Sequence, residues 1–440
     1  MEIQDVVAGD PVQRAIALLS SLPARDSQES CIDRLQMVEQ ATRMLAGDKA
    51  LTTTKFIDHR QRDEAVLKVP VADQLKGIDA EVGFARGESP FVGAALTRTA
   101  TALHTVLPNT LAALNEGRVS EYHTRVVAEQ TSHLSDAHRK EIDAAIAHRL
   151  GKASTSQLRR LIQGHAYRLD RAAAEARAEA NKGQRRVCMN PASDGLVFVT
   201  AELPTHQGLA VMDAITRLTN QRLNKEKAVD IDRKPLSRDQ VMADVFVELL
   251  TGQTTAEGVT AEVIVVMQDS TFLGDDDLPA WLLGEGPLPA GTVKDWLADP
   301  DAAIFLRRLY TRPSDGQLVA MDSTRRHFPD GLAKMLRIRD DVCATPWCNN
   351  PVQEADHRHP WAQGGRTSWE NATGLCRRCN QRKENRGWTY TGTPDELIVT
   401  TPTGHSYPVD TRPPLAELKH WNSDPPAPFG AIDIAWSTAA

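Results

Sequence analysis

Apolar residues recur at helical spacing through most of the first 250 positions of the chain. The segment Ile32–Leu45 has the pattern of an amphipathic helix. Ser89 followed by Pro90 predicts a second helix start, because proline is well tolerated in the first turn. The apolar residues that then share one helix face are Phe91, Ala95, Leu96, Ala102 and Leu103.

Polar breaks and capping residues divide the following stretch into more helices. Asn115–Gly117 interrupts the pattern, Ser120 and Ser135 are each placed to cap a new helix, and Ser156 is expected to begin a further one. The last of these is expected to continue through a stretch rich in Ala, Arg and Glu as far as Ala180. The pattern therefore predicts a mainly helical N-terminal region.

The pattern becomes mixed after this point. Two short β-like runs, Val187–Met189 and Leu196–Leu203, predict a pair of strands. Helical spacing returns at His206–Arg222 and at Ser237–Leu250, and β-branched residues predict a buried strand at Ala261–Met267.

The next hundred residues alternate between loops and short elements. Phe272–Pro300 is acidic and rich in Gly and Pro, so we expect a surface connection with one short helix at Val293–Leu297. Phe305–Asp322 predicts a hairpin around a Pro-Ser-Asp-Gly turn, and Gly331–Arg339 predicts a short helix. The chain after about Pro413 is rich in Pro and small residues and is expected to be loose.

Size and composition limit the class of protein. At 440 residues the chain is too long for one ordinary core, which favours two or three domains. Its 41% hydrophobic and 25% charged residues are typical of globular proteins. Apolar runs stay well short of the ~20 residues that span a bilayer, and the N-terminus has no signal-peptide pattern. We therefore expect a cytoplasmic protein with no membrane partner.

The cysteines mark the first candidate chemistry. Four of the six form two close pairs, Cys343 with Cys348 and Cys376 with Cys379. In a reducing compartment such pairs favour metal binding over disulfides. Four thiolates form a closed tetrahedral zinc shell, which indicates a structural rather than a catalytic site. Four unrelated thiols are the alternative.

A carboxylate and an imidazole lie between the two cysteine pairs. Asp356-His357 follows Val352–Ala355, which is a candidate short strand. Adjacent strand residues point to opposite faces, so one side chain could bind a metal while the other faces a substrate. Asn380 follows Cys379 near an expected helix start, where its amide oxygen could bind a hard cation.

Charge is distributed unevenly along the chain. Lys334–Trp388 has a net charge of +4, although the whole chain has −7. The overall negative charge argues against a protein that coats nucleic acid with its whole surface. The local excess is where a phosphate backbone would have to dock, although a solvated basic face would give the same count.

Together these motifs resemble the HNH endonucleases of the ββα-metal type with four zinc-binding cysteines. The resemblance spans about 50 residues and implies a small α+β domain stapled by zinc. The matching positions, in the family's order, are Asp356-His357, Gly364-Gly365, Asn371, the pair Cys376 and Cys379, Asn380 and Lys383.

The resemblance also implies a mechanism. HNH enzymes hydrolyse phosphodiester bonds of DNA with one divalent cation, here Mg²⁺ or Mn²⁺. By position, His357 would be the general base, and Asp356 and Asn380 would hold the catalytic cation. Asn371 would brace the loop between the strands and orient His357. The candidates for nucleic-acid phosphate contacts are Arg358, Arg377, Arg378, Arg382 and Lys383.

Some positions depart from the family pattern or add to it. The last metal position is often His, and Asn380 stands there in this chain. His359 is an extra imidazole that either assists His357 or is a surface residue. Trp347, Trp361 and Trp369 either stack on bases or shield the zinc-stapled hairpin.

The upstream region, from about residue 30 to 325, resembles the actinobacterial "domain of unknown function 222", also called the 13E12 repeat family. The resembling stretches are Thr97–Gly117 and Asp194–Pro204. The domains expected from these resemblances are an N-terminal extension (1–30), a mostly helical domain of unknown function (31–325), an HNH nuclease domain (326–395) and a C-terminal tail (396–440).

Three functional hypotheses remain open from the sequence. The leading one is a metal-dependent DNA endonuclease. The second is a zinc-stapled nucleic-acid-binding module without catalysis, against which the presence of Asp356, His357 and Asn380 together argues. In the third, the helical region is a scaffold for DNA or a partner and the nuclease is its effector. A homodimer or a partner protein bound through the helical region is compatible with each.

Overall fold

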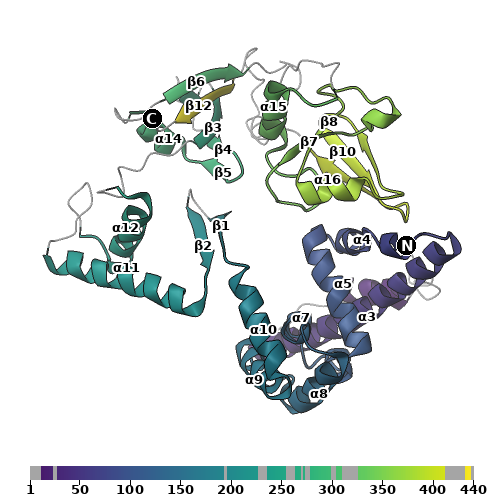
Figure 1. Cartoon of the computed structure of the whole chain (residues 1–440). Helices are drawn as coiled ribbons and strands as arrows, with labels where there is room; N and C mark the ends of the chain where they lie inside the picture. Colours follow the sequence, from purple (N-terminus) through teal and green to yellow (C-terminus); the bar gives the residue numbers. More distant parts are fainter. Residues whose placement is uncertain are drawn as a thin grey trace. The chain divides into compact units, whose positions relative to one another are not determined.

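A computed structural model describes most of the chain and divides it into two compact units. The first unit comprises Met1–Gln74 and Ala95–Ala174, and the second comprises Leu75–Ala94 and Glu175–Ala440. The described residues are 11–22, 27–192, 196–225, 235–253, 263–268, 271–272, 278–298, 304–309, 326–411 and 432–437. Figure 1 shows the elements of both units in chain colours.

The first unit, called here the helical unit, contains only helices among its described elements. Helices α5 and α10 begin or end in the second unit. The elements are α2 (Pro11–Ser20), α3 (Gln28–Val66), η1 (Val71–Asp73), α5 (Pro90–Thr105), α6 (Pro108–Asn115), α7 (Glu121–Thr131), α8 (Asp136–Ile146), η2 (Ala147–Arg149), α9 (Thr155–Leu169) and α10 (Arg171–Lys182).

Serine caps begin several of these helices. The side chains of Ser120 and Ser135 accept hydrogen bonds from the third residue of α7 and α8, which confirms both predicted caps. Helix α9 begins at Thr155, one residue before the predicted start at Ser156, and its cap Ser154 forms a reciprocal capping box with Gln157. The predicted run to Ala180 is also interrupted, since α9 ends at Leu169 and α10 begins at Arg171.

Aliphatic residues form the core of the helical unit. Side chains of α5 to α9, among them Leu103, Ile142 and Leu158, are buried in one cluster. Helix α3 contributes mainly the small residues Ala46 and Ala50 to it. The amphipathic pattern at 32–45 therefore predicted a helix correctly but a buried face wrongly, because Leu35, Val38 and Leu45 are exposed.

The second unit begins with a hairpin and a helix pair. Strands β1 (Arg186–Pro191) and β2 (Val197–Glu202) are antiparallel and confirm the predicted strand pair. Helices α11 (Thr205–Lys225) and α12 (Arg238–Thr251) pack together through a small apolar cluster that includes Val241.

A five-stranded antiparallel sheet follows, in the order β5-β4-β3-β12-β6. Helix α14 (Ala290–Ala298) covers the apolar cluster of this sheet. The strands are β3 (Val263–Gln268), β4 (Ala280–Leu282), β5 (Gly286–Leu288), β6 (Ile304–Leu309) and β12 (Ile432–Ser437).

This sheet corrects two predictions made from composition. The expected surface connection contains β4 and β5, and Ala280 and Leu288 are buried because both strands belong to the sheet. The end of the chain is not loose throughout, since β12 pairs with both β3 and β6. The turn predicted at Pro313–Gly316 lies outside the described residues.

Residues 326–411 form a small α+β domain, called here the C-terminal module. A two-stranded sheet, β7-β8, and a three-stranded sheet, β11-β10-β9, carry two helices (Figure 1). Its elements are α15 (Asp330–Asp340), β7 (Glu354–His357), η4 (Trp361–Gln363), β8 (Ala372–Leu375), α16 (Arg377–Lys383), β9 (Thr389–Gly392), β10 (Glu396–Thr400) and β11 (Ser406–Asp410). A mainly helical region followed by a small α+β domain is the predicted fold class.

A helix from far upstream completes this module. Helix α4 (Ile78–Ala85) inserts Phe84 among aromatic rings of the module, at 5.8 Å from Trp347 and 5.3 Å from Tyr407. Glu81 of α4 accepts a hydrogen bond of 2.9 Å from the Thr403 hydroxyl. Strands β10 and β11, which were expected in the tail, lie in the same apolar cluster as Phe84. The module core therefore joins segments more than 250 residues apart in sequence.

No helix in the described part of the chain has both the length and the apolar character needed to cross a membrane.

Candidate metal centre and active site

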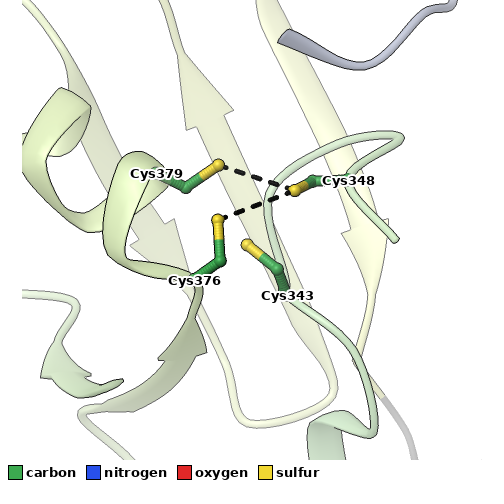
Figure 2. A group of neighbouring side chains, drawn as sticks. All are labelled: Cys343, Cys348, Cys376 and Cys379. Carbon is green, nitrogen blue, oxygen red and sulfur yellow. Dashed lines mark hydrogen bonds between the residues drawn. The ribbon is translucent and has the colours of Figure 1, made fainter. Parts of the chain in front are cut away.

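Four cysteines meet at one end of α16. Cys343 and Cys348 lie in the loop after α15, whose ends are joined by a β-bridge between Val342 and Pro351. Cys376 occupies the N-cap position of α16, and Cys379 lies in its first turn. Figure 2 shows the four sulfur atoms turned toward one another. The four side chains are buried.

The sulfur positions fit a tetrahedral metal. All four Sγ atoms lie within 4.8 Å of one another. The Sγ of Cys348 is 3.9 Å from that of Cys376 and 3.7 Å from that of Cys379. A zinc ion with Zn–S bonds of about 2.3 Å requires sulfurs about 3.8 Å apart. The donor set therefore fits structural zinc.

The thiols also affect one another's ionisation. Hydrogen bonding with Cys348 and the other two cysteines, followed by burial, raises the pKa of Cys343. Hydrogen bonding with Cys343 is the largest cause that lowers the pKa of Cys376, to about 6. Four close buried sulfurs cannot all carry negative charge without a cation among them.

Beyond the cysteines, strands β7 and β8 form a hairpin, and the short helix α16 packs against β7. The register of β7 and β8 pairs Asp356 with Thr373 and His357 with Ala372. Strand alternation places Glu354 and Asp356 on one side of β7, and their hydrogen bonds show that this side faces α16. The Lys383 ammonium donates to Asp356 Oδ2 at 2.5 Å, and Asn380 Nδ2 donates to Glu354 Oε2 at 2.7 Å.

The His357 side chain is buried among aromatic and polar groups. Its ring centroid is 4.7 Å from that of Phe328 and 5.8 Å from that of Trp361. Its Nε2 is 2.8 Å from the Thr367 hydroxyl, and its Nδ1 is 3.9 Å from Asp356 Oδ1. Burial lowers the pKa of His357, with smaller opposing and reinforcing effects from Asp356 and nearby cations. The neutral imidazole is thus favoured at neutral pH.

Asn371 connects the two ends of the β7–β8 loop. Its Oδ1 accepts from the main-chain N–H of His359 at 2.8 Å, and its Nδ2 donates to the carbonyls of His359 and Arg366. The two glycines make this closure possible. Gly364 has φ +91°, and a Cβ on Gly365 would lie only 1.9 Å from the His359 carbonyl oxygen.

Asn380 has one amide atom without a partner. Its Nδ2 donates to Glu354, but its buried Oδ1 accepts no hydrogen bond from any group in the described part of the chain. A buried carbonyl oxygen of this kind is costly unless something binds it. Together with the carboxylate of Asp356, it offers the oxygen ligands that Mg²⁺ and Mn²⁺ prefer.

The five basic candidates are not equivalent. Arg358 is buried, donates to Thr373 Oγ1, and has its pKa lowered by burial to about 10. Lys383 is buried against β7. Arg382 forms an ion pair with Asp79 of α4 at 3.4 Å. Arg377 and Arg378 are exposed at the start of α16.

The other side chains singled out from the sequence separate into distinct environments. His359 is exposed and lies beyond the end of β7. Its Nε2 is 3.0 Å from the Gln363 carbonyl oxygen. Trp369 is buried and packs on the Arg339 guanidinium, 4.7 Å from the ring centroid. Trp347 and Trp361 are 45% and 37% exposed, so they have ring surface available for a ligand.

Three further residues of the site were not predicted from the sequence. Glu354 lies two positions before Asp356, so the period of a strand could have placed it on the same face. Thr367 and Arg339 had no comparable signal. The Arg339 guanidinium is buried, pairs with Asp340 at 2.5 Å, and donates to the carbonyls of Trp369 and Ala372.

Two family models match the chain. The one described as "Domain of unknown function (DUF222)" matches residues 33–340, and the one described as "HNH endonuclease" matches residues 343–386. These are the two families that the sequence was expected to resemble.

One curated relative is similar to part of the chain. An uncharacterized protein of Mycobacterium tuberculosis strain H37Rv, Rv3776, is 36% identical over 107 residues. The match covers 22% of this chain and only 20% of that relative. No solved structure matches the chain.

Proposed function

Because this chain belongs to the DUF222 family and carries an HNH endonuclease domain at residues 343–386, we propose that it is a metal-dependent endonuclease that hydrolyses phosphodiester bonds of DNA. The proposal is carried by three groups of the neighbouring elements β7 and α16, of which His357 Nδ1 and Asp356 Oδ1 lie 3.9 Å apart. These are the imidazole of His357, the carboxylate of Asp356, and the partnerless amide oxygen of Asn380.

His357 acts as the general base through Nδ1. The Thr367 hydroxyl is 3.3 Å from the Arg326 carbonyl, to which it donates its only proton. Its oxygen is then an acceptor, so His357 Nε2 carries the proton of the 2.8 Å hydrogen bond. Nδ1 is left with a free lone pair on the side of Asp356, where it can take a proton from an attacking water. Thr367 is thus a positioning residue.

Asp356 and Asn380 would hold the catalytic cation through Oδ1 atoms. A divalent cation bound there supplies charge stabilisation for the phosphate oxygens as the bond breaks. Lys383 keeps the Asp356 carboxylate turned toward α16 by donating to Oδ2, and Glu354 fixes the Asn380 amide so that its oxygen is the free atom. Asn371 braces the loop that carries Thr367, and so maintains the pocket of His357.

The exposed Arg377 is the best-placed of the basic candidates for a phosphate near this site. Its side chain is 72% exposed and pairs only loosely with Glu354, at 3.4 Å. Arg358 and Lys383 instead support the hairpin from inside, because both are buried and hydrogen-bonded to β7 or β8 groups.

The direct test is cleavage of supercoiled plasmid by the full chain with Mg²⁺ or Mn²⁺ at low salt. We expect His357→Ala to reduce the rate by roughly 10²–10⁴-fold, because the mutant lacks the base. Thr367→Val should reduce the rate less, because it removes the hydrogen bond that holds the tautomer but leaves the imidazole. His405→Ala is the matched control, since His405 is an exposed imidazole of the same module.

The zinc content of every variant must equal that of the wild type, so that loss of activity is not loss of fold. Equal cleavage by wild type and His357→Ala would overturn the assignment of the base. Binding of DNA by zinc-loaded wild type without cleavage in either metal would instead favour the zinc-stapled binding module.

A further inference from the structure

A second feature of the module is a cleft on the far side of α16. Its volume is about 1070 Å³, and its wall runs from the start of α4 past the cysteine loop to α16. Small-molecule pockets typically have volumes of ~300–1,000 Å³, so the cleft can take a segment of a polymer. The lining includes the side chains of Phe91, Trp347, Arg378, Gln381, Arg382 and Asn385.

One face of α16 lines the cleft, and the opposite face contacts strand β7. Arg378, Gln381 and Arg382 have the i, i+3, i+4 spacing of one helix face, and all three line the cleft. Asn380 and Lys383 contact β7 instead. At about 100° per residue, the centres of these two faces lie about 180° apart around the helix. The cleft is therefore separate from the site of His357.

The charge of the cleft suits a polyanion. Arg378 and Arg382 project from α16, and Lys76 and Arg186 join the lining from upstream segments, although Arg186 is ion-paired with Glu202 at 2.7 Å. Asp79 is the acidic side chain among the described lining residues, and it is paired with Arg382 at 3.4 Å. Gln381 and Asn385 add amides, which can hydrogen-bond to the edges of bases.

Two exposed aromatic side chains line the same cleft. Trp347 is 45% exposed and Phe91 is 66% exposed. Trp347 also has φ +55°, a left-handed conformation that is strained for a bulky residue and that is often retained at functional sites. Phe84 and Tyr407 support the ring from the protein side, at 5.8 Å each. The indole is thus a supported platform with its free surface toward the cleft.

From these observations we propose that the cleft binds an unpaired segment of nucleic acid. Sites for single strands combine a cationic groove, which holds the phosphates, with aromatic side chains on which the bases stack. Bases are free to stack on protein only where they are unpaired, so the exposed Trp347 and Phe91 favour a single strand over a continuous duplex.

The inference rests on the proposed nuclease function and extends it to the substrate. A helix is about 10–12 Å across with its side chains, so a strand held in the cleft is separated from His357 by the body of α16. The cleft then holds a flank of the substrate while another phosphate is cut. The preferred substrates are DNA molecules with a single-stranded flank beside the cleavage point.

The test measures binding of a fluorescein-labelled single-stranded DNA of about 16 nucleotides to the full chain by fluorescence anisotropy, at several salt concentrations. Trp347→Ala should weaken binding about tenfold, because it removes one stacking platform. Arg378→Ala should lower the slope of log K against log salt by about 0.7, the value for one phosphate contact with a single strand. Because Arg378 is exposed, this variant does not depend on refolding of the core.

Two residues outside the cleft are matched controls. Arg386 is an exposed arginine shortly after α16, and Trp296 of α14 is 43% exposed, close to the value for Trp347. Arg386→Ala and Trp296→Ala should bind the oligonucleotide as the wild type does. His357→Ala should also bind normally while losing cleavage, and Arg378→Ala should raise KM of a flanked substrate with little change in kcat.

These outcomes distinguish the two proposals. If Trp347→Ala and Arg378→Ala bind the single strand as tightly as their controls, the cleft proposal is wrong even when the wild type cuts DNA. The cleft proposal is equally wrong if both variants lose affinity only for duplex DNA, or only for an acidic peptide such as polyglutamate. If Trp347→Ala and Arg378→Ala weaken binding of the single strand but the wild type never cleaves DNA, the cleft proposal is supported and the proposed nuclease function is wrong.

Discussion

The helical unit and the C-terminal module bury different kinds of side chain in their cores. The helical unit buries a broad aliphatic cluster, and its buried carboxylate, Asp143, accepts hydrogen bonds from the start of α6 through the N–H groups of Asn109 and Thr110. The module instead buries four thiols, three aromatic rings and the cations Arg339, Arg358 and Lys383 in a much smaller volume of chain.

This difference indicates which region depends on a ligand for its stability. Aliphatic burial stabilises the helical unit by itself, at roughly 25 cal/mol for each Å² removed from water. Buried charges and thiols do not stabilise a core without partners, so we expect the module to depend on a metal bound by its four cysteines and on a complete network of hydrogen bonds. The C-terminal module, which carries the candidate metal and active sites, is therefore the region whose folding we expect to require a bound metal.

The largest expected effect follows from removing zinc with a chelator. The module should lose on the order of 10 kcal/mol and unfold, while the helical unit keeps its structure. Hydrogen exchange followed by mass spectrometry should show lost protection at 343–411 and retained protection at 97–169. Peptides of α4 should lose protection with the module, because Phe84 packs in its core. Uniform protection in both regions after zinc loss would contradict the comparison.

The next effect concerns the buried guanidinium of the module. Arg339→Met should lower the local unfolding free energy of the module by about 3–5 kcal/mol, because Asp340 is left buried without its charged partner. Arg337→Met on the exposed side of α15 is the control and should change little. The measurement is exchange of the β8 amides in the zinc-loaded protein. A loss below ~1 kcal/mol would mean that the ion pair is not needed.

The smallest effect concerns a cap in the helical unit. Ser154→Ala should cost about 1 kcal/mol, because the N-terminus of α9 loses the capping hydrogen bond from Gln157 N–H. Ser156→Ala, two residues later and exposed, should stay within about 0.5 kcal/mol of the wild type. Exchange of the α9 amides compares the two variants, and equal losses would argue against the cap assigned by the structure.

Much of the fold could be predicted from local patterns. Ser120 and Ser135 mark helix starts because a capping side chain acts within one turn, and the break at Asn115–Gly117 is equally local. The predictions at Leu35 and at the β4–β5 segment failed for a different reason. Whether an apolar face is buried depends on distant partners, which periodicity does not include.

The same division holds for the candidate site. The order of cysteines, Asp356-His357, Asn371 and Asn380 was sufficient to expect a zinc-stapled HNH domain, and the family matches confirm that resemblance. The roles of the individual residues stay predictions. The sequence could not show that Arg358 is buried while Arg377 is exposed, because both are arginines near the same motif.

What the sequence determined by itself is the chemistry within reach of a short segment: which side chains ligate, which residues cap, and which run favours helix or strand. The tertiary structure decided which of these groups meet. It brought Phe84 and Asp79 of α4 to a module more than 250 residues away, and it set Thr367 against His357 and Arg378 on the cleft face of α16. The reason is physical. Propensities and caps act over one or two turns of chain, whereas burial and hydrogen-bond satisfaction depend on whichever surfaces pack together.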